Sequence, residues 1–167
     1  LIEEKNKSIT DSINYANRIQ TALLPSDEEL ESLFEESFIM YNPRDIVSGD
    51  FYWTSNLSSY MIIAVADCTG HGVPGALMSM IGINSLNQII IDQNITKPSQ
   101  ALNQLDNKIY SSLNKQSADY YSSDGMDIAM CAIRKEDLSM VYYGANRTIL
   151  IVRDGKVMEY KQTKIAI

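Results

Sequence analysis

The chain has 167 residues, with 14 Lys and Arg against 21 Asp and Glu and a formal net charge of -7. This length predicts one domain with a real core, and the acidic balance argues against nucleic acid or an anionic membrane surface as a partner. One histidine excludes His-rich metal sites, and no segment reaches the roughly 18–20 apolar residues of a membrane span. Cys68 and Cys131 lie in apolar runs, which favours reduced core thiols and a cytoplasmic setting.

The first 25 residues have the pattern of an amphipathic helix. Apolar residues recur at steps of three, four and seven from Ile2 to Leu23, with charged residues between them. Two interpretations stay open: a helix packed on its own domain, or the end of a coiled coil that continues upstream and pairs two chains. In the second, Asn6 and Gln20 on the apolar stripe would set the register. Pro25 ends the helix, and the acidic run after it is interpreted as a solvated connector.

From residue 38 onward the pattern changes to β, then α, then β. We expect strands at 38–41, 51–54, 60–66, 127–133, 139–143, 148–152 and 156–160. The run 60–66 is almost continuously apolar, as for a strand covered on both faces. One helix, with Pro74 at its first position, would extend to about residue 91, and another would begin near Pro98.

Two connecting segments are predicted to be a loop and a turn. The polar stretch 115–123 is interpreted as a loop, and Asp154-Gly155 predicts a hairpin turn. Two central helices followed by a run of strands predict an α+β fold. In it, mainly antiparallel sheets form a β-sandwich flanked by helices.

Two segments place an aspartate at a predicted strand end beside glycines: residues 43–53 (PRDIVSGDFYW) and 66–76 (ADCTGHGVPGA). A carboxylate at the end of a buried strand is costly unless a charge compensates it, and a hard divalent cation does so well. Glycines let the backbone approach, so that a main-chain carbonyl can serve as a further oxygen ligand. Asp50 and Asp67, on neighbouring strands, are therefore candidate metal ligands.

Other interpretations of these segments stay open. Asp67 alone fits a helix cap, and Asp50 alone fits the end of a turn. The Gly70-His71-Gly72 turn resembles a phosphate-binding loop only weakly, because it lacks the lysine and the spacing of the known loops. A nucleotide-binding domain would need a parallel sheet and Arg44 as the basic partner. No arrangement of Ser, His and acid indicates a hydrolase triad.

Together the two segments resemble the signature of the SpoIIE-type bacterial serine phosphatases, a branch of the metal-dependent protein phosphatase 2C-like superfamily. The resemblance extends to residues 19–20 (IQ), 23–25 (LLP), 125–127 (GMD) and 144–146 (GAN), in family order over most of the chain. It implies a β-sandwich flanked by helices. It also implies two Mn²⁺ or Mg²⁺ ions that activate a water to attack the phosphorus of phosphoserine or phosphothreonine.

The resemblance implies roles for individual residues as well. Asp50 and Asp67 match metal-binding aspartates, and the main-chain carbonyl of Cys68 matches a backbone ligand. No protein nucleophile is implied, because the metal-activated water attacks directly. Three residues would support the site from beside it: Gly49, Gly70 and His71.

One departure from the family pattern concerns the remaining metal aspartates, which lie in a downstream Asp-Gly turn and an Asp-Asp pair. The sequence ends at Ile167, before either is expected. We therefore expect residues 1–25 to be a helical linker and 26–167 a phosphatase-like domain that lacks its C-terminal part, with little or no activity alone. Asp124-Gly125 and Asp154-Gly155 resemble the missing turn only superficially.

The resemblance thus predicts a metal-dependent serine/threonine phosphatase of bacterial signalling. Its substrate would be a phosphorylated protein such as an anti-sigma-factor antagonist. The N-terminal helix would connect it to an upstream sensor module and support a homodimer. The protein would be cytoplasmic, or the cytoplasmic part of a membrane-bound sensor protein, without membrane contact in this segment. The alternative is a non-catalytic pseudophosphatase or dimerising partner-binding module.

Overall fold

The structure is a computed structural model that describes residues 1–114, 124–164 and 166–167. Its helices are α1 (Ile2–Thr21), α2 (Asp27–Leu33), α3 (Gly72–Leu86), a π-helical continuation of α3 (Asn87–Asp92), and α4 (Pro98–Leu113). Its strands are β1 (Phe51–Asn56), β2 (Tyr60–Cys68), β3 (Met126–Arg134), β4 (Met140–Ala145), β5 (Ile149–Arg153) and β6 (Lys156–Tyr160). The loop expected at 115–123 lies outside the described residues.

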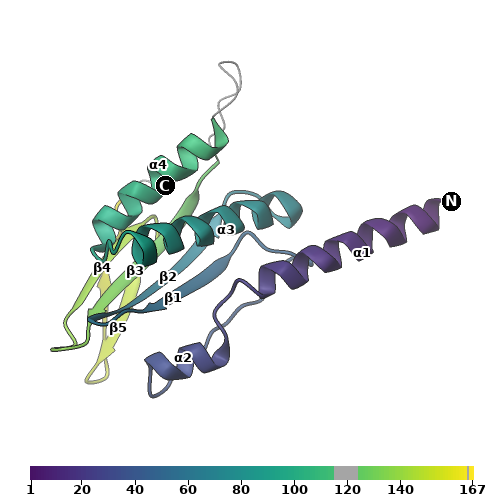
Figure 1. Ribbon diagram of the computed structural model, residues 1–167. Helices are drawn as coiled ribbons and strands as arrows, with labels where there is room; N and C mark the ends of the chain where they lie inside the picture. Colours follow the sequence, from purple (N-terminus) through teal and green to yellow (C-terminus); the bar gives the residue numbers. More distant parts are fainter. Residues whose placement is uncertain (115–123, 165) are drawn as a thin grey trace.

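The strands form two antiparallel sheets. The larger has the order β1-β2-β3-β4, and β5 and β6 form a separate hairpin at the predicted Asp154-Gly155 turn. Helices α3 and α4 lie across one face of the larger sheet (Figure 1), which confirms the predicted α+β fold. Because the pairings between named strands are antiparallel, the parallel sheet required by a nucleotide-binding interpretation is not formed by them.

The core lies between the larger sheet and the two helices that cover it. Phe51, Ile62, Leu105 and Ile128 are at most 1% exposed, and burying side chains of this size contributes about 1.5–3 kcal/mol each. Gly82 lets α3 approach the sheet closely, because a Cβ there would lie 2.9 Å from Cζ of Phe51. This contact fixes α3, and with it the turn before α3, against the ends of the strands.

Strand β2 is covered on one face only, contrary to the expectation from its apolar run. Ala64 and Ala66 are 1% and 2% exposed, whereas Val65 between them is 58% exposed. Successive side chains of a strand point to opposite faces, so the covered face is the one beneath the helices. The sequence did not reveal this because both faces of β2 carry apolar residues.

Three local predictions were wrong. No strand forms at 38–41, and Pro74 is the third rather than the first residue of α3. The acidic connector contains α2, which begins with a capping box. In it the Glu29 N–H donates to the Ser26 hydroxyl (3.2 Å) and the Ser26 N–H donates to the Glu29 carboxylate (2.8 Å). Leu30 and Leu33 are buried, so this segment packs on the domain.

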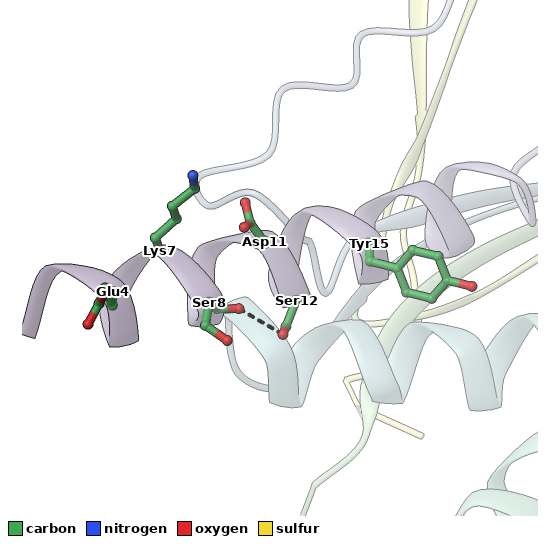
Figure 2. A pocket seen from close by; sticks show the side chains of 6 residues that line it. All are labelled: Glu4, Lys7, Ser8, Asp11, Ser12 and Tyr15. Atoms are coloured by element: carbon green, nitrogen blue, oxygen red, sulfur yellow. Dashed lines mark hydrogen bonds between the residues drawn. The ribbon is translucent and has the colours of Figure 1, made fainter. Parts of the chain in front are cut away.

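The predicted N-terminal helix is confirmed as α1, which ends at Thr21 and extends away from the sheet (Figure 1). Gln20 is its one buried residue. A shallow groove runs along α1 (Figure 2), lined by Glu4, Lys7, Ser8, Asp11, Ser12 and Tyr15. All six belong to α1 itself, so the groove is the surface of one helix and no candidate site. Among the described residues, no helix is long and apolar enough to cross a membrane.

Candidate metal centre

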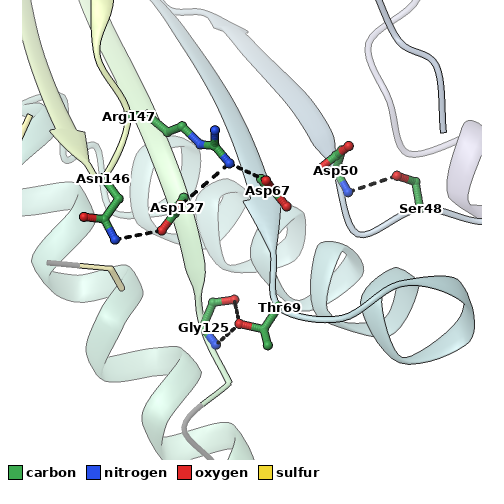
Figure 3. A network of polar contacts seen from close by, with 8 residues as sticks. All are labelled: Ser48, Asp50, Asp67, Thr69, Gly125, Asp127, Asn146 and Arg147. Carbon is green, nitrogen blue, oxygen red and sulfur yellow. Dashed lines mark hydrogen bonds and ion pairs between the residues drawn. The ribbon is translucent and has the colours of Figure 1, made fainter. Parts of the chain in front are cut away.

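The pairing of β1 with β2 places Asp50 beside Asp67. Phe51 pairs with Ala66 in the antiparallel register, so Asp50, one residue before β1, lies opposite Asp67 (Figure 3). Residues directly opposite in such a pair have Cβ atoms about 4.5–5.5 Å apart and point to the same face. The sequence predicted this juxtaposition from two strand ends. The metal-binding role of the two carboxylates stays a prediction.

The two carboxylates act on each other electrostatically. Partial burial, and then the negative charge of Asp67, raise the pKa of Asp50 above its usual value, while Arg147 acts in the opposite direction. Burial, with smaller contributions from Asp67 and Asp50, raises the pKa of the Cys68 thiol to about 12. Cys68 and Cys131 are both buried and free. The Cys68 thiol is therefore protonated at neutral pH. The hard donor atom that Cys68 could offer to a cation is its main-chain carbonyl oxygen.

Three glycines hold that carbonyl next to the aspartates. A Cβ at Gly49 would lie 3.1 Å from the Cys68 carbonyl oxygen, and a Cβ at Gly75 would lie 2.7 Å from the carbonyl oxygen of Gly70. Gly70 itself has a φ of 89°, which side-chain-bearing residues rarely adopt. The loop before β1 and the turn before α3 therefore contact each other directly. They enclose a pocket of about 140 Å³ that both aspartates line.

His71 supports the turn rather than the helix end. It is the N-cap residue of α3, but its side chain makes no capping hydrogen bond. Instead its Nδ1 lies 2.9 Å from Oδ2 of Asp45, which links the turn to the segment before β1. Because His71 is the cap residue, the interpretation of Asp67 as the helix cap is wrong.

A cation from a distant part of the sequence also reaches the two strands. The Arg147 guanidinium pairs with the Asp67 carboxylate and lies 3.7 Å from Oδ2 of Asp127 (Figure 3). Asn146 donates through Nδ2 to Oδ1 of Asp127 at 3.1 Å. Asp127 and Asn146 lie within the family motifs 125–127 and 144–146, whereas Arg147 was not singled out from the sequence. The register of β2 with β3 pairs Asp67 with Asp127. This register is what brings the two carboxylates together, and the sequence alone does not give it.

Helix α1 is tied to the loop that precedes Asp50 by Gln20, which is 2% exposed. Its Nε2 donates to the Ser48 carbonyl (2.6 Å) and to the Ser79 hydroxyl (2.8 Å), and its Oε1 accepts from the Ser48 N–H (3.0 Å). The Ser48 hydroxyl in turn accepts from the Asp50 N–H at 3.0 Å. The proposed role of Gln20 in setting a coiled-coil register was therefore wrong, because its amide is used within the domain.

The donor set fits a hard divalent cation in kind. Two carboxylates and a main-chain carbonyl supply oxygen atoms, which Mg²⁺ and Mn²⁺ prefer. Within residues 1–114, 124–164 and 166–167, no cluster of three or more His, Cys, Asp or Glu could hold a metal ion. Of the two look-alike turns, Asp124-Gly125 leads into β3 and Asp154-Gly155 joins β5 to β6. The described residues thus bring together two carboxylates and one carbonyl, whose role as metal ligands stays a prediction.

The comparison with protein families decides what kind of domain carries this arrangement. The model for stage II sporulation protein E (SpoIIE) matches residues 58–167. The chain belongs to the SpoIIE family. This confirms the resemblance read from the two motifs, and the matched region contains Asp67 and the Gly-rich turn, while Asp50 lies before it.

Solved structures agree with the family assignment. The SiaA-PP2C domain of Pseudomonas aeruginosa is 31% identical with a TM-score of 0.84, over 98% of this chain and 64% of that one. The RsbU and RsbW domains of Rv1364c from Mycobacterium tuberculosis share the fold at 21% identity and a TM-score of 0.55, over 73% of this chain and 32% of that one. The chain therefore spans less than two thirds of the SiaA structure. No curated protein matches it.

The contacts of Gln20 lead to a first prediction. Gln20→Ala removes three buried hydrogen bonds and leaves the backbone N–H and carbonyl of Ser48 without these partners, at about 1–3 kcal/mol for each unsatisfied group. We expect the free energy of unfolding, measured by urea denaturation, to fall by about 2–4 kcal/mol. Asn6→Ala, on the exposed part of the same helix, should change it by less than about 0.5 kcal/mol. Equal losses in the two variants would contradict a specific role for the Gln20 amide.

The pKa of Asp50 leads to a second prediction. Because this pKa is raised on folding, the folded protein holds the proton more tightly than the unfolded chain. The free energy of unfolding therefore falls as the pH rises from 3.8 through the raised value. Asp50→Asn removes this partly desolvated charge and should stabilise the metal-free protein at pH 7 by up to about 1 kcal/mol.

Urea denaturation in EDTA at pH 7 and at lower pH measures this effect. The difference between Asp50→Asn and the parent protein should narrow toward pH 3.8. Asp106→Asn, an exposed position on α4 with the same change of charge, should show no comparable gain. A loss of stability in metal-free Asp50→Asn at pH 7 would refute the proposed repulsion.

Proposed function

We propose that the protein containing this chain is a metal-dependent phosphatase that hydrolyses phosphoserine or phosphothreonine in a protein of a bacterial signalling pathway. The observation that carries the proposal is the pair Asp50 and Asp67, which line one small pocket in a chain of the SpoIIE family, with the Cys68 carbonyl next to Gly49. Two Mn²⁺ or Mg²⁺ ions, when bound, would supply an activated water and neutralise charge on the phosphoryl oxygens.

The residues of the chain would hold and orient the reacting groups. Asp50 and Asp67 provide the carboxylates, and the contact between Gly49 and Gly70 fixes the Cys68 carbonyl beside them. The Tyr41 hydroxyl donates to the Asp50 carbonyl at 3.2 Å, which helps to hold the backbone of the ligand in place. A preorganised set of ligands of this kind needs little rearrangement during the reaction.

A route through a cysteine nucleophile has no support in the described residues. A thiol attacks as the thiolate, but burial first of all raises the pKa of Cys68 to about 12 and that of Cys131 to about 11. Both side chains are also buried. The proposal is therefore direct attack by water, as the family resemblance implies.

A groove beside the aspartates favours a protein substrate over a small phosphate ester. It has a volume of about 610 Å³ and is lined by residues 38–42, by the exposed face of β1, β2 and β3, and by the start of β5. Asp50, Asp67 and Arg147 lie along it together with apolar side chains such as Phe38 and Val65. We propose that it receives the phosphorylated segment of a partner protein, such as an anti-sigma-factor antagonist.

A non-catalytic module is the second candidate. It is favoured by the absence, among the described residues, of a group of three or more His, Cys, Asp or Glu that could hold a metal ion, and by the ion pair of Arg147 with Asp67. Under this alternative the complete protein would bind divalent ions weakly and show no turnover. We also propose that residues 1–167 alone have little activity, because metal affinity falls as carboxylate ligands are lost.

Asp67→Asn in the natural full-length protein tests the catalytic proposal. Loss of an outer-shell partner of a metal typically costs 10–100-fold in activity, so loss of a carboxylate ligand should lower kcat/KM by at least about a hundredfold. The assay follows release of phosphate from a phosphoserine peptide and from p-nitrophenyl phosphate with Mn²⁺. EDTA should abolish turnover and added Mn²⁺ should restore it.

Asp154→Asn is the matched control, since it makes the same change of charge in the β5–β6 turn. Its turnover should equal that of the parent protein. Undiminished turnover in Asp67→Asn would refute the metal role. A parent protein without any turnover would favour the non-catalytic module.

We further propose that α1 pairs with α1 of a second chain and connects the domain to an upstream sensor module. Ile2 and Ile9 are 76% and 58% exposed. Together with Ala16 they recur every seven residues along α1, which extends from the domain (Figure 1). A repeat of this spacing is the seam of a coiled coil. Gln20, which is used within the domain, marks where the free seam ends.

Sedimentation equilibrium of Ile9→Asp tests this pairing. A buried charge at the seam should abolish concentration-dependent dimerisation of the parent chain. Asn14→Asp adds the same charge away from the repeat and should dimerise like the parent. A monomeric parent chain at every concentration, or equal dimerisation of Ile9→Asp, would refute the pairing.

A further inference from the structure

The strongest unexplained interaction in the site is the pair between Arg147 and Asp67. The guanidinium Nη2 of Arg147 lies against Oδ2 of Asp67 and, at 3.7 Å, beside Oδ2 of Asp127 (Figure 3). Asp67 is also the carboxylate proposed to bind metal. One cation of the chain itself therefore takes up an oxygen that a divalent ion would need.

The backbone around Arg147 is held in place for this contact. The Arg147 carbonyl accepts a hydrogen bond from the Tyr142 hydroxyl. Asn146, with a φ of 54°, adopts the left-handed conformation that Asn tolerates better than most residues. The side chain of Asn146 bonds to Asp127. The connection between β4 and β5 thus delivers the guanidinium to β2 and β3 from a fixed position.

A guanidinium and a divalent cation use the same oxygen in different ways. The guanidinium donates hydrogen bonds to the carboxylate lone pairs, whereas Mg²⁺ or Mn²⁺ must coordinate the oxygen directly at short distance. The two positive charges would also repel each other. Coordination of a metal by Oδ2 of Asp67 therefore requires the ion pair with Arg147 to open.

We propose that Arg147 is a built-in counter-cation of the metal centre. It neutralises Asp67 when no metal is bound and must release Asp67 for a divalent ion to bind, while Asp127 and the fixed backbone keep it nearby. Arg147 thereby sets the divalent affinity below the value that the carboxylates alone would give. This inference rests on the proposed role of Asp67.

Isothermal titration with Mn²⁺ provides the first test, on the natural full-length protein. Arg147→Met keeps the length of the side chain and removes the charge. Exposed ion pairs contribute up to about 1 kcal/mol, or about fivefold in an equilibrium constant, so Arg147→Met should bind Mn²⁺ about three- to fivefold more tightly. Arg153→Met, at an exposed position of β5, removes the same charge and should leave the affinity unchanged.

Nuclear magnetic resonance of the arginine side chains provides the second test. The Nε–H signal of Arg147, assigned by its loss in Arg147→Met, should shift when diamagnetic Mg²⁺ saturates the site. In metal-free Asp67→Asn it should already lie near its Mg²⁺-saturated position. The Arg153 signal should not move.

The inference is overturned if Arg147→Met binds Mn²⁺ no more tightly than the parent, if neither protein binds Mn²⁺, or if the Arg147 signal ignores Mg²⁺. Failure of the proposed function has a different signature, since it appears as unchanged phosphatase turnover in Asp67→Asn. If Arg147→Met binds Mn²⁺ more tightly but the parent protein has no turnover, the counter-cation role of Arg147 is supported and the proposed phosphatase activity is refuted.

Discussion

Two carboxylates held opposite each other by an antiparallel strand pair set the conditions for the rest of the site. Asp50 and Asp67 repel each other, and the pKa of Asp50 is raised by partial burial and then by this repulsion. The fold keeps them side by side because strand pairing and the packed core fix both strand ends. Each of these contributes far more to the free energy of folding than one exposed charge contact costs. Arg147 then offsets part of the charge.

The close approach of two chain segments makes this juxtaposition possible. The loop before β1 and the turn before α3 touch at Gly49 and Gly75, where a Cβ would lie 2.9 Å and 2.7 Å from the carbonyl oxygen of Gly70. Gly82 also allows close packing in the core, because it lets α3 lie against the ring of Phe51. Glycines that the sequence alone suggests are turn residues are therefore also positions of close packing, which allow the helix to lie against the strand ends.

The sequence predicted those parts that depend on local patterns. The two helices over the sheet, six of the seven expected strands and the facing aspartates follow from periodicity and from strand–glycine–helix order. The strand expected at 38–41 does not form, and Phe38 there is 92% exposed, because an apolar run needs a neighbouring strand. Arg147 lies 80 residues from its partner Asp67 and Gln20 lies 28 from Ser48. Such pairs leave no local signal.

These two distant contacts act on different physical properties of the same centre. Gln20 bonds to the backbone of Ser48, and the Ser48 hydroxyl holds the N–H of Asp50, so α1 fixes where one carboxylate lies without changing its charge. Arg147 bonds to the carboxylate of Asp67, so the β4–β5 connection offsets part of the charge of the other carboxylate. Position and charge are therefore controlled from opposite ends of the chain. A divalent ion bound between the aspartates would respond to both, because its affinity depends on ligand geometry and on the net charge of the ligands.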